Sequence, residues 1–166
     1  MEQMDIQPAV SGIDQPAVRP YAGVMTESFD FNEVNRKVIA EFRENGGTAG
    51  GMFAGAPLIL VHHVGAKSGT ARIAPLVYFA EGERLFIFGS KGGADEHPAW
   101  YHNLVANPKT KVELGTETFD VVARVLTGAE RDEYYAKNAA VAPQFADYQN
   151  KTSRTIPVIE LERVGA

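Results

Sequence analysis

Two glycine-rich loops of this chain combine positive charge, hydroxyl groups and open backbone, which are the parts of a site for an anionic ligand. The residues concerned are Lys67, Ser68 and Arg72 in or just after the first loop and Ser90 and Lys91 in the second. Backbone N–H groups beside glycine form a concave anion site, and lysine or arginine adds charge-assisted hydrogen bonds. Each loop follows an apolar run typical of a buried strand, so the three cations converge if the two strand ends are neighbours. Solvated lysines in ordinary hairpin turns are the alternative interpretation.

Other common catalytic and metal-binding motifs are missing from the sequence. The chain has no cysteine, no Gly-x-Ser-x-Gly elbow, no phosphate-loop pattern and no Gly-x-Gly-x-x-Gly fingerprint. Consecutive His62 and His63 point to opposite faces of a strand, and His97 and His102 are predicted to point in different directions around a helix. We therefore predict no metal site and no serine or cysteine nucleophile.

Four aromatic residues after the second loop have two open interpretations. Trp100, Tyr101, Phe145 and Tyr148 either form a flat wall beside a ligand or fill the core, as large aromatic side chains commonly do. Polar neighbours favour an accessible hydroxyl group for Tyr148, whereas Trp100 and Phe145 taken alone fit the core.

Length and composition indicate one globular domain and limit its partners. The chain has 166 residues, of which 45% are hydrophobic and 22% charged. A formal net charge of −5 argues against nucleic acid as a partner, while a small anionic ligand needs only a local cluster of cations. No stretch fits a membrane span or a signal peptide, so we predict a cytoplasmic protein without stable membrane insertion.

The pattern of apolar residues predicts a mixed α+β fold with a β-barrel core. Residues 1–27 contain prolines but no periodicity and are predicted to be a flexible arm, which leaves residues 28–166 as the folded domain. A first helix begins near residue 28 or 30 and ends at residues 45–47, and its predicted buried stripe is Phe31, Val34, Val38 and Phe42.

Further helices are predicted from about residue 100 to 107 and at residues 129–140. Strands are predicted at residues 57–64, 73–80, 85–89, 111–115, 118–127 and 156–162. About six strands in hairpin order favour an antiparallel sheet, and closing it into a barrel would remove its exposed edges.

Several ordered motifs between residue 31 and the C-terminus resemble those of the deazaflavin-dependent nitroreductase family. They are residues 65–75 (GAKSGTARIAP), 89–94 (GSKGGA), 98–104 (PAWYHNL), 106–108 (ANP), 148–149 (YQ) and 154–157 (RTIP). The resemblance implies a split β-barrel fold with flanking helices. It also implies binding of coenzyme F-420, an 8-hydroxy-5-deazaflavin that carries a phosphate and a polyglutamate tail.

The resemblance also implies roles for individual residues, carried over by position. The phosphate and tail contacts of the family match Lys67, Ser68, Arg72 and Lys91 of this chain. Positions on the deazaflavin side match Pro75, Val77 and Ser90. The adjoining motif contains Trp100, Tyr101 and Asn103, of which Trp100 and Asn103 are expected to contact the cofactor, and an aromatic position near the substrate matches Tyr148. The chain departs from the members that reduce bicyclic nitroimidazoles, because those carry tyrosines at the positions of Val77, Ala142 and Phe145. Reduction of such drugs is therefore not implied, and the N-terminal arm lacks the amphipathic segment by which some members lie on a membrane.

The function implied is transfer of a hydride from reduced coenzyme F-420 to a conjugated acceptor such as a quinone, an enone or a nitroaromatic compound. Two residues are predicted to take part in catalysis. Ser90 would hold the ring or stabilise charge on the acceptor, and Tyr148 would donate a hydrogen bond or a proton. The alternatives are an FMN-dependent split-barrel oxidoreductase and a non-catalytic carrier of deazaflavin or haem. The sequence leaves a homodimer open.

Overall fold

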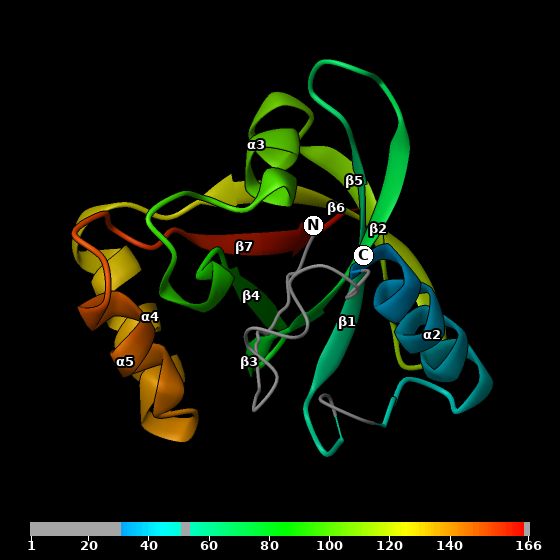
Figure 1. Cartoon of the computed structure of the whole chain (residues 1–166), viewed down its shortest axis with the longest axis horizontal. Coiled ribbons are helices and arrows are strands. Elements are labelled where there is room, and N and C mark those ends of the chain that lie inside the picture. Colours follow the sequence, from blue (N-terminus) through cyan, green and yellow to red (C-terminus); the bar gives the residue numbers. More distant parts are fainter. Residues whose placement is uncertain (1–30, 51–53, 165–166) are drawn as a thin grey trace.

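The computed structural model describes residues 31–50 and 54–164, and the predicted flexible arm at residues 1–27 lies outside them (Figure 1). The helices are α2 (Phe31–Glu44), the short 3-10 helix η2 (Lys91–Gly93), α3 (Ala99–Ala106), α4 (Gly128–Val141) and α5 (Gln144–Asn150). The strands are β1 (Leu58–Val64), β2 (Ala71–Val77), β3 (Phe79–Glu81), β4 (Arg84–Phe88), β5 (Lys109–Leu114), β6 (Glu117–Val125) and β7 (Val158–Arg163). These elements confirm the predicted α+β class.

The strands form one 7-stranded sheet in the order β2-β1-β5-β6-β7-β4-β3, with antiparallel neighbours throughout. β2 and β3 lie at opposite edges of this order, yet only Tyr78 separates them in the chain. The sheet therefore curls until its two edges approach each other, which produces the split β-barrel. The strand predicted at residues 73–80 is in fact two strands, because the chain leaves one edge at Val77 and enters the other at Phe79.

Alternate residues of β1 face two different hydrophobic clusters, as the two-residue period of a strand requires. Val61 packs inside the barrel, whereas its neighbour Leu60 packs outside it, beneath α2. Val38 and Phe42 of α2 are only 6% and 1% exposed, which confirms the predicted buried stripe at these positions. The side chain of Phe31 lies outside the described residues.

Helices α4 and α5 form a third hydrophobic cluster with β4 and β7 (Figure 1). The ring of Phe86 on β4 stacks on Tyr134 of α4, with 4.2 Å between the ring centroids. Phe145 is 7% exposed in the same cluster, and its carbonyl oxygen accepts a hydrogen bond of 2.5 Å from the Tyr135 hydroxyl. The core interpretation of Phe145 is therefore confirmed, and the segment that contains it is a helix, which the sequence analysis did not predict.

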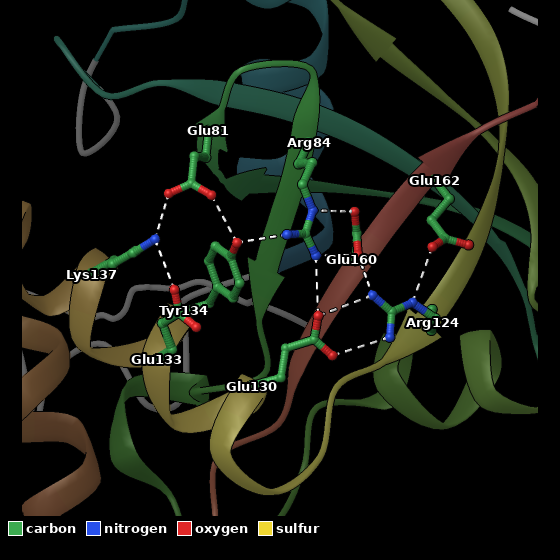
Figure 2. Close-up of polar contacts among 9 residues, drawn as sticks. All are labelled: Glu81, Arg84, Arg124, Glu130, Glu133, Tyr134, Lys137, Glu160 and Glu162. Carbon is green, nitrogen blue, oxygen red and sulfur yellow. Dashed lines mark hydrogen bonds and ion pairs between the residues drawn. The ribbon is translucent and has the colours of Figure 1, made fainter.

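A network of ion pairs attaches α4 to the sheet, as Figure 2 shows. At its centre Glu160 of β7 is 5% exposed and accepts hydrogen bonds from Arg84, at 2.9 Å, and from Arg124, at 2.6 Å. At the outer end Lys137 of α4 pairs with Glu81 of β3 at 2.5 Å. Because these charges already have partners, the network holds α4 in place and is not a candidate for ligand binding.

Candidate ligand-binding site

Helix α3 lies between the two glycine-rich loops at one end of the barrel (Figure 1). Four successive antiparallel pairings lead from β1 to β4, so these two strands run in the same direction and their loops leave the sheet at the same end. Three strands nevertheless separate β1 from β4, so the strand ends are not neighbours. The connection between the loops is made by α3 instead, and the convergence of Lys67, Arg72 and Lys91 stays a prediction.

Asn103 of α3 fixes the position of the first loop. Its side chain is 6% exposed, its Oδ1 accepts a hydrogen bond of 2.9 Å from the Ala66 N–H, and its Nδ2 lies 2.9 Å from Nδ1 of His63. Burial lowers the pKa of His63 to about 4, so near pH 7 the ring is neutral and its Nδ1 can accept from the amide. Asn103, predicted as a cofactor contact, already has protein partners on both sides, and we interpret it as a residue that positions the loop.

The first loop presents its predicted contact residues to solvent. Lys67, Ser68 and Arg72 are all exposed, and a hydrogen bond of 2.9 Å from the Gly65 N–H to the Thr70 carbonyl closes the turn beneath them. Within the described part of the chain neither Lys67 nor Arg72 has an ion-pair partner. Unlike the arginines of Figure 2, these two cations are therefore available to an anion.

The backbone of the second loop adopts conformations that few residues allow. Lys91 has a φ of 47°, in the left-handed region, where a residue other than glycine carries strain of about 1–3 kcal/mol. Apart from its chain neighbours, no described residue would lie within 4 Å of a Cβ atom at Gly92, whereas one at Gly93 would lie 2.9 Å from the carbonyl oxygen of Tyr148. The loop is thus open on one side and closed against α5 on the other.

Lys91 differs from the cations of the first loop because it has an acidic partner. Its Nζ lies 3.3 Å from the Glu96 carboxylate, and the two side chains are 34% and 77% exposed. An ion pair this exposed contributes at most about 1 kcal/mol, so an anionic ligand can displace it.

Arg154 is a candidate functional residue that the sequence analysis assigned no role, although its motif carried part of the resemblance. Its guanidinium donates hydrogen bonds to the carbonyl oxygens of Gly89 (3.1 Å), Ser90 (2.8 Å) and Ala94 (2.7 Å). One of the same nitrogen atoms lies 2.9 Å from Nδ1 of His97. A single half-buried side chain therefore binds both ends of the second loop.

Tyr148 and Ser90, the two predicted catalytic residues, lie on segments that pack against each other. Ser90 is 8% exposed just before η2, and η2 packs on α5, which carries Tyr148. The ring of Tyr148 is half-buried and meets Phe145 edge to face, with 5.3 Å between centroids. The Nζ of Lys151 lies 5.8 Å from the centre of the same ring.

The remaining predicted contacts lie deeper in the protein. Trp100 is 4% exposed inside the barrel, which confirms the core interpretation of this residue. Val77 packs in the cluster beneath α2, and Pro75 lies two residues earlier on the same face of β2. Their predicted contact with a deazaflavin ring is not tested by these positions and stays a prediction.

A groove of about 630 Å³ opens beside Arg72, where β1 separates from β5. The ladder between these strands ends at Val61, and the Thr110 hydroxyl then donates to the His62 carbonyl at 2.6 Å. Lys109 and Lys111 of β5 line the groove together with valines, and neither lysine has an ion-pair partner among the described residues. The groove therefore offers a second pair of available cations next to the first loop.

The histidines do not form a metal site in the described part of the chain. His97 and His102 do not point in different directions around one helix, and that prediction was wrong. His97 precedes α3, and its ring lies 5.8 Å from that of His102 between centroids. Within residues 31–50 and 54–164 no three histidine, aspartate or glutamate side chains are placed to hold a metal ion. His62 instead bonds to Glu113 at 2.7 Å, on the opposite face from His63.

None of the described helices combines the length and apolar character needed to cross a membrane.

The sequence and the fold are both similar to those of known proteins. Residues 34–163 match the family model described as "F420H(2)-dependent quinone reductase". A protein of Mycobacterium tuberculosis that bears the same description is 38% identical over 130 residues, which cover 75% of this chain and 86% of that protein.

Two solved structures share the fold at appreciable sequence identity. One, titled as an F420-H2 dependent reductase, has a TM-score of 0.59 and 40% identity and covers 64% of this chain and 94% of its own. Another, described as a domain-swapped dimer, has a TM-score of 0.61 and 36% identity and covers 79% of this chain and 98% of its own.

Proposed function

Because the chain belongs to the F420H(2)-dependent quinone reductase family, we propose that it is an oxidoreductase that transfers a hydride from reduced coenzyme F-420 to a quinone. The names of its relatives support a quinone over the enone and nitroaromatic acceptors that the sequence left open. They also support coenzyme F-420 over the FMN alternative.

The observation that supports this proposal most strongly is which lysine and arginine side chains have ion-pair partners and which do not. Arg84 and Arg124 are bound to glutamates, whereas Lys67 and Arg72 are exposed, have no ion-pair partner among the described residues, and belong to a loop that Asn103 holds in place. A fixed loop with available cations fits a ligand that carries a phosphate and several carboxylates, because the loop need not be ordered when the ligand binds.

The second loop fits the same ligand. Its backbone is open beside Gly92, and the Lys91 ammonium group can exchange Glu96 for a stronger anionic partner. In this proposal Lys67, Ser68, Arg72 and Lys91 bind the phosphate and tail, and Pro75, Val77 and Ser90 line the ring.

Reduced coenzyme F-420 supplies the hydride when bound, so the protein has to bind, orient and exclude water. In this proposal Ser90 holds the ring or donates a hydrogen bond to the acceptor oxygen as it gains charge. Tyr148, on the adjoining helix α5, would deliver a hydrogen bond or a proton to the reduced product.

A fluorescence titration with oxidised coenzyme F-420 and with FMN tests the cofactor. We expect the deazaflavin to bind in the micromolar range and FMN to bind far more weakly, and the opposite order would support the FMN alternative. Lys67→Ala is expected to weaken deazaflavin binding by about 1.5–3 kcal/mol, the range for a charge-assisted hydrogen bond. An unchanged dissociation constant would remove Lys67 from the site.

Turnover of the reduced cofactor with menadione separates an enzyme from a carrier. Tight binding without oxidation above background would favour the carrier. Tyr148→Phe is expected to lower the turnover number more than the cofactor affinity, because only the hydroxyl group is lost. A loss confined to affinity would contradict the catalytic role.

Two further expectations about the protein stay proposals. A homodimer is supported by the similar structure that is described as a domain-swapped dimer, and sedimentation at micromolar concentration would test it. A cytoplasmic location stays a prediction of the sequence.

A further inference from the structure

The segment that follows α5 is held rigidly enough to act as a support for the second loop. Gln149 accepts a hydrogen bond of 3.0 Å from the Ile156 N–H and donates one of 2.7 Å to the Arg154 carbonyl. Arg131 of α4 donates to the Ile156 carbonyl at 2.8 and 3.0 Å. Arg154 therefore projects from a segment that is fixed at its own carbonyl group and at Ile156, two residues later.

Arg154 supplies the second loop with the backbone hydrogen bonds that a neighbouring strand supplies in a sheet. The pairing of β4 with the β7 segment ends with a hydrogen bond of 3.0 Å from the Gly89 N–H to the Pro157 carbonyl oxygen, and no described strand pairs with residues 90–94. The carbonyl groups of Gly89, Ser90 and Ala94 instead all accept from the one guanidinium. A planar guanidinium can donate in several fixed directions at once, whereas an ammonium is a single point charge. Gly89 also lacks room for a Cβ atom, which would lie 2.8 Å from Pro157, so the two segments are in close contact.

His97, which follows the second loop, contacts the same guanidinium. Its Nδ1 lies 2.9 Å from the Arg154 guanidinium and can accept a hydrogen bond only when that nitrogen carries no proton. A protonated ring would place a second positive charge against Arg154 and lose this bond.

We propose that Arg154 is a positioning residue that holds residues 89–94 in their ligand-binding conformation, and that this hold is complete only while His97 is neutral. The proposal rests on the proposed function for the identity of the ligand alone. The hold itself belongs to the ligand-free protein and can be measured there.

The charged and titratable groups around His97 support this dependence on protonation. Arg154 faces the ring from the segment after α5, and His102 and Tyr101 face it from α3, with ring centroids at 5.8 and 4.6 Å. Asp95 and Glu96 precede it in the chain, and Glu96 is paired with Lys91. Burial, the charge of Arg154 and then that of His102 lower the pKa of His97 below its ordinary value.

Hydrogen exchange of the ligand-free protein tests the hold directly. The Gly93 and Ala94 amides bond within the loop at 2.8 and 3.2 Å, so their protection factors report its order. For Arg154→Lys we expect protection to fall by about 10- to 100-fold, the equivalent of one charge-assisted hydrogen bond. The matched control Arg124→Lys changes an arginine of the network in Figure 2 and should leave these two amides as they are.

The role of His97 is tested by the pH dependence of the same protection factors, which are corrected for intrinsic exchange. In the wild type we expect protection of Gly93 and Ala94 to decrease as the pH falls below about 6.5, the ordinary histidine pKa. His97→Gln should make protection independent of pH in this range, and His102→Gln should leave the decrease in place. A wild-type profile that stays flat, or one that His97→Gln does not change, would overturn the dependence on His97.

Binding of oxidised coenzyme F-420 links the hold to the ligand. Arg154→Lys should raise the dissociation constant at least about tenfold, because the loop must first return to its ordered conformation before the cofactor can bind. The value of kcat at saturating cofactor should change by less than about threefold, because the bound cofactor keeps the loop ordered. Unchanged affinity and unchanged protection would overturn the positioning role. A wild type that binds no deazaflavin would instead refute the proposed function and leave the exchange result to decide this inference.

Discussion

The Nδ2 atom of Asn103 lies 2.9 Å from Nδ1 of His63, and the other end of the same amide accepts from the Ala66 N–H. A buried histidine on β1 and a turn that presents Lys67 are thereby connected through one side chain of α3. The cations of the first loop are exposed, but their backbone is fixed from inside the barrel.

Asn103→Leu is expected to destabilise the protein and to weaken cofactor binding together. The change removes the partner of the His63 ring and that of the Ala66 N–H. His63 is only 7% exposed, and an unsatisfied buried group costs about 1–3 kcal/mol. Urea unfolding measures the first effect and a titration with oxidised coenzyme F-420 the second. Asn107→Ala, at the exposed position that follows the last residue of α3, is the control and should change neither. Normal affinity in a destabilised Asn103→Leu protein would show that the loop does not depend on this residue.

The protein is expected to lose stability as the pH falls from about 6.5 to 4, because His63 must become protonated. Its pKa in the folded state is about 4, below the ordinary value, so the unfolded chain binds the proton more readily and the stabilisation is complete only above the ordinary pKa. The loss amounts to about 3 kcal/mol at 1.36 kcal/mol per pKa unit. His97 contributes in the same direction.

Urea unfolding at a series of pH values measures this loss. His63→Gln keeps an acceptor for Asn103 without a titrating ring, so the slope between about pH 6.5 and 4 should become smaller. His102→Gln, exposed on α3, should leave the slope unchanged. Equal slopes in the wild type and in His63→Gln would contradict the buried neutral histidine.

Below pH 4 the protein is expected to lose further stability as Glu113 becomes protonated. The hydrogen bond from Arg43 lowers the pKa of this carboxyl group to about 2 in the folded protein.

Alanine at Gly93 is expected to be much more damaging than alanine at Gly92. Both glycines have positive φ, 65° at Gly92 and 88° at Gly93, so each alanine carries a backbone cost of about 1–2 kcal/mol. Only at Gly93 would the new Cβ atom also lie 2.9 Å from the Tyr148 carbonyl oxygen, which forces the loop away from α5. The free energy of unfolding and the menadione turnover of the two variants provide the comparison. Similar values for both would show that the contact between the loop and α5 is not tight in solution.

Much of the hairpin structure could be predicted because its signals are local. The tight turn between Glu81 and Arg84 and the alternation in β5 and β6 depend only on nearby residues. The interruption at Tyr78 could not be predicted, because residues 73–80 form an unbroken apolar run and only the position of β3 at the far edge of the sheet shows where β2 ends.

The sequence was enough to predict the cationic residues of the candidate site, but not the residues that hold its two loops in place. Lys67 and Lys91 stand out because each lies beside a serine in a glycine-rich turn after an apolar run. Arg154 and Asn103 do not stand out in this way, since their contacts join residues 64 and 37 positions apart and depend on the sheet order. For Trp100 the sequence left open a position in the core and one beside a ligand. Only the structure distinguishes them, because the side chain is 4% exposed.

The groove beside Arg72 predicts an effect of cofactor tail length. Lys109 and Lys111 line it without ion-pair partners among the described residues, so a long polyglutamate tail that passes Arg72 would reach them. The double variant Lys109→Ala/Lys111→Ala should lower affinity for a long-tailed cofactor by about three- to tenfold, since exposed ion pairs contribute up to about 1 kcal/mol each. Affinity for the tail-less deazaflavin should stay the same. Added salt should reduce the difference between the long-tailed and tail-less forms.

The control for this prediction removes two positive charges elsewhere. Arg36→Ala/Lys37→Ala takes them from the exposed side of α2, so any change that it shares with the groove variant reflects the net charge of the protein rather than a contact. Equal loss for long and absent tails would place Lys109 and Lys111 outside the tail path. In that case the tail would be held by Lys67, Arg72 and Lys91 alone, and affinity should no longer increase once the tail is long enough to contact these three residues.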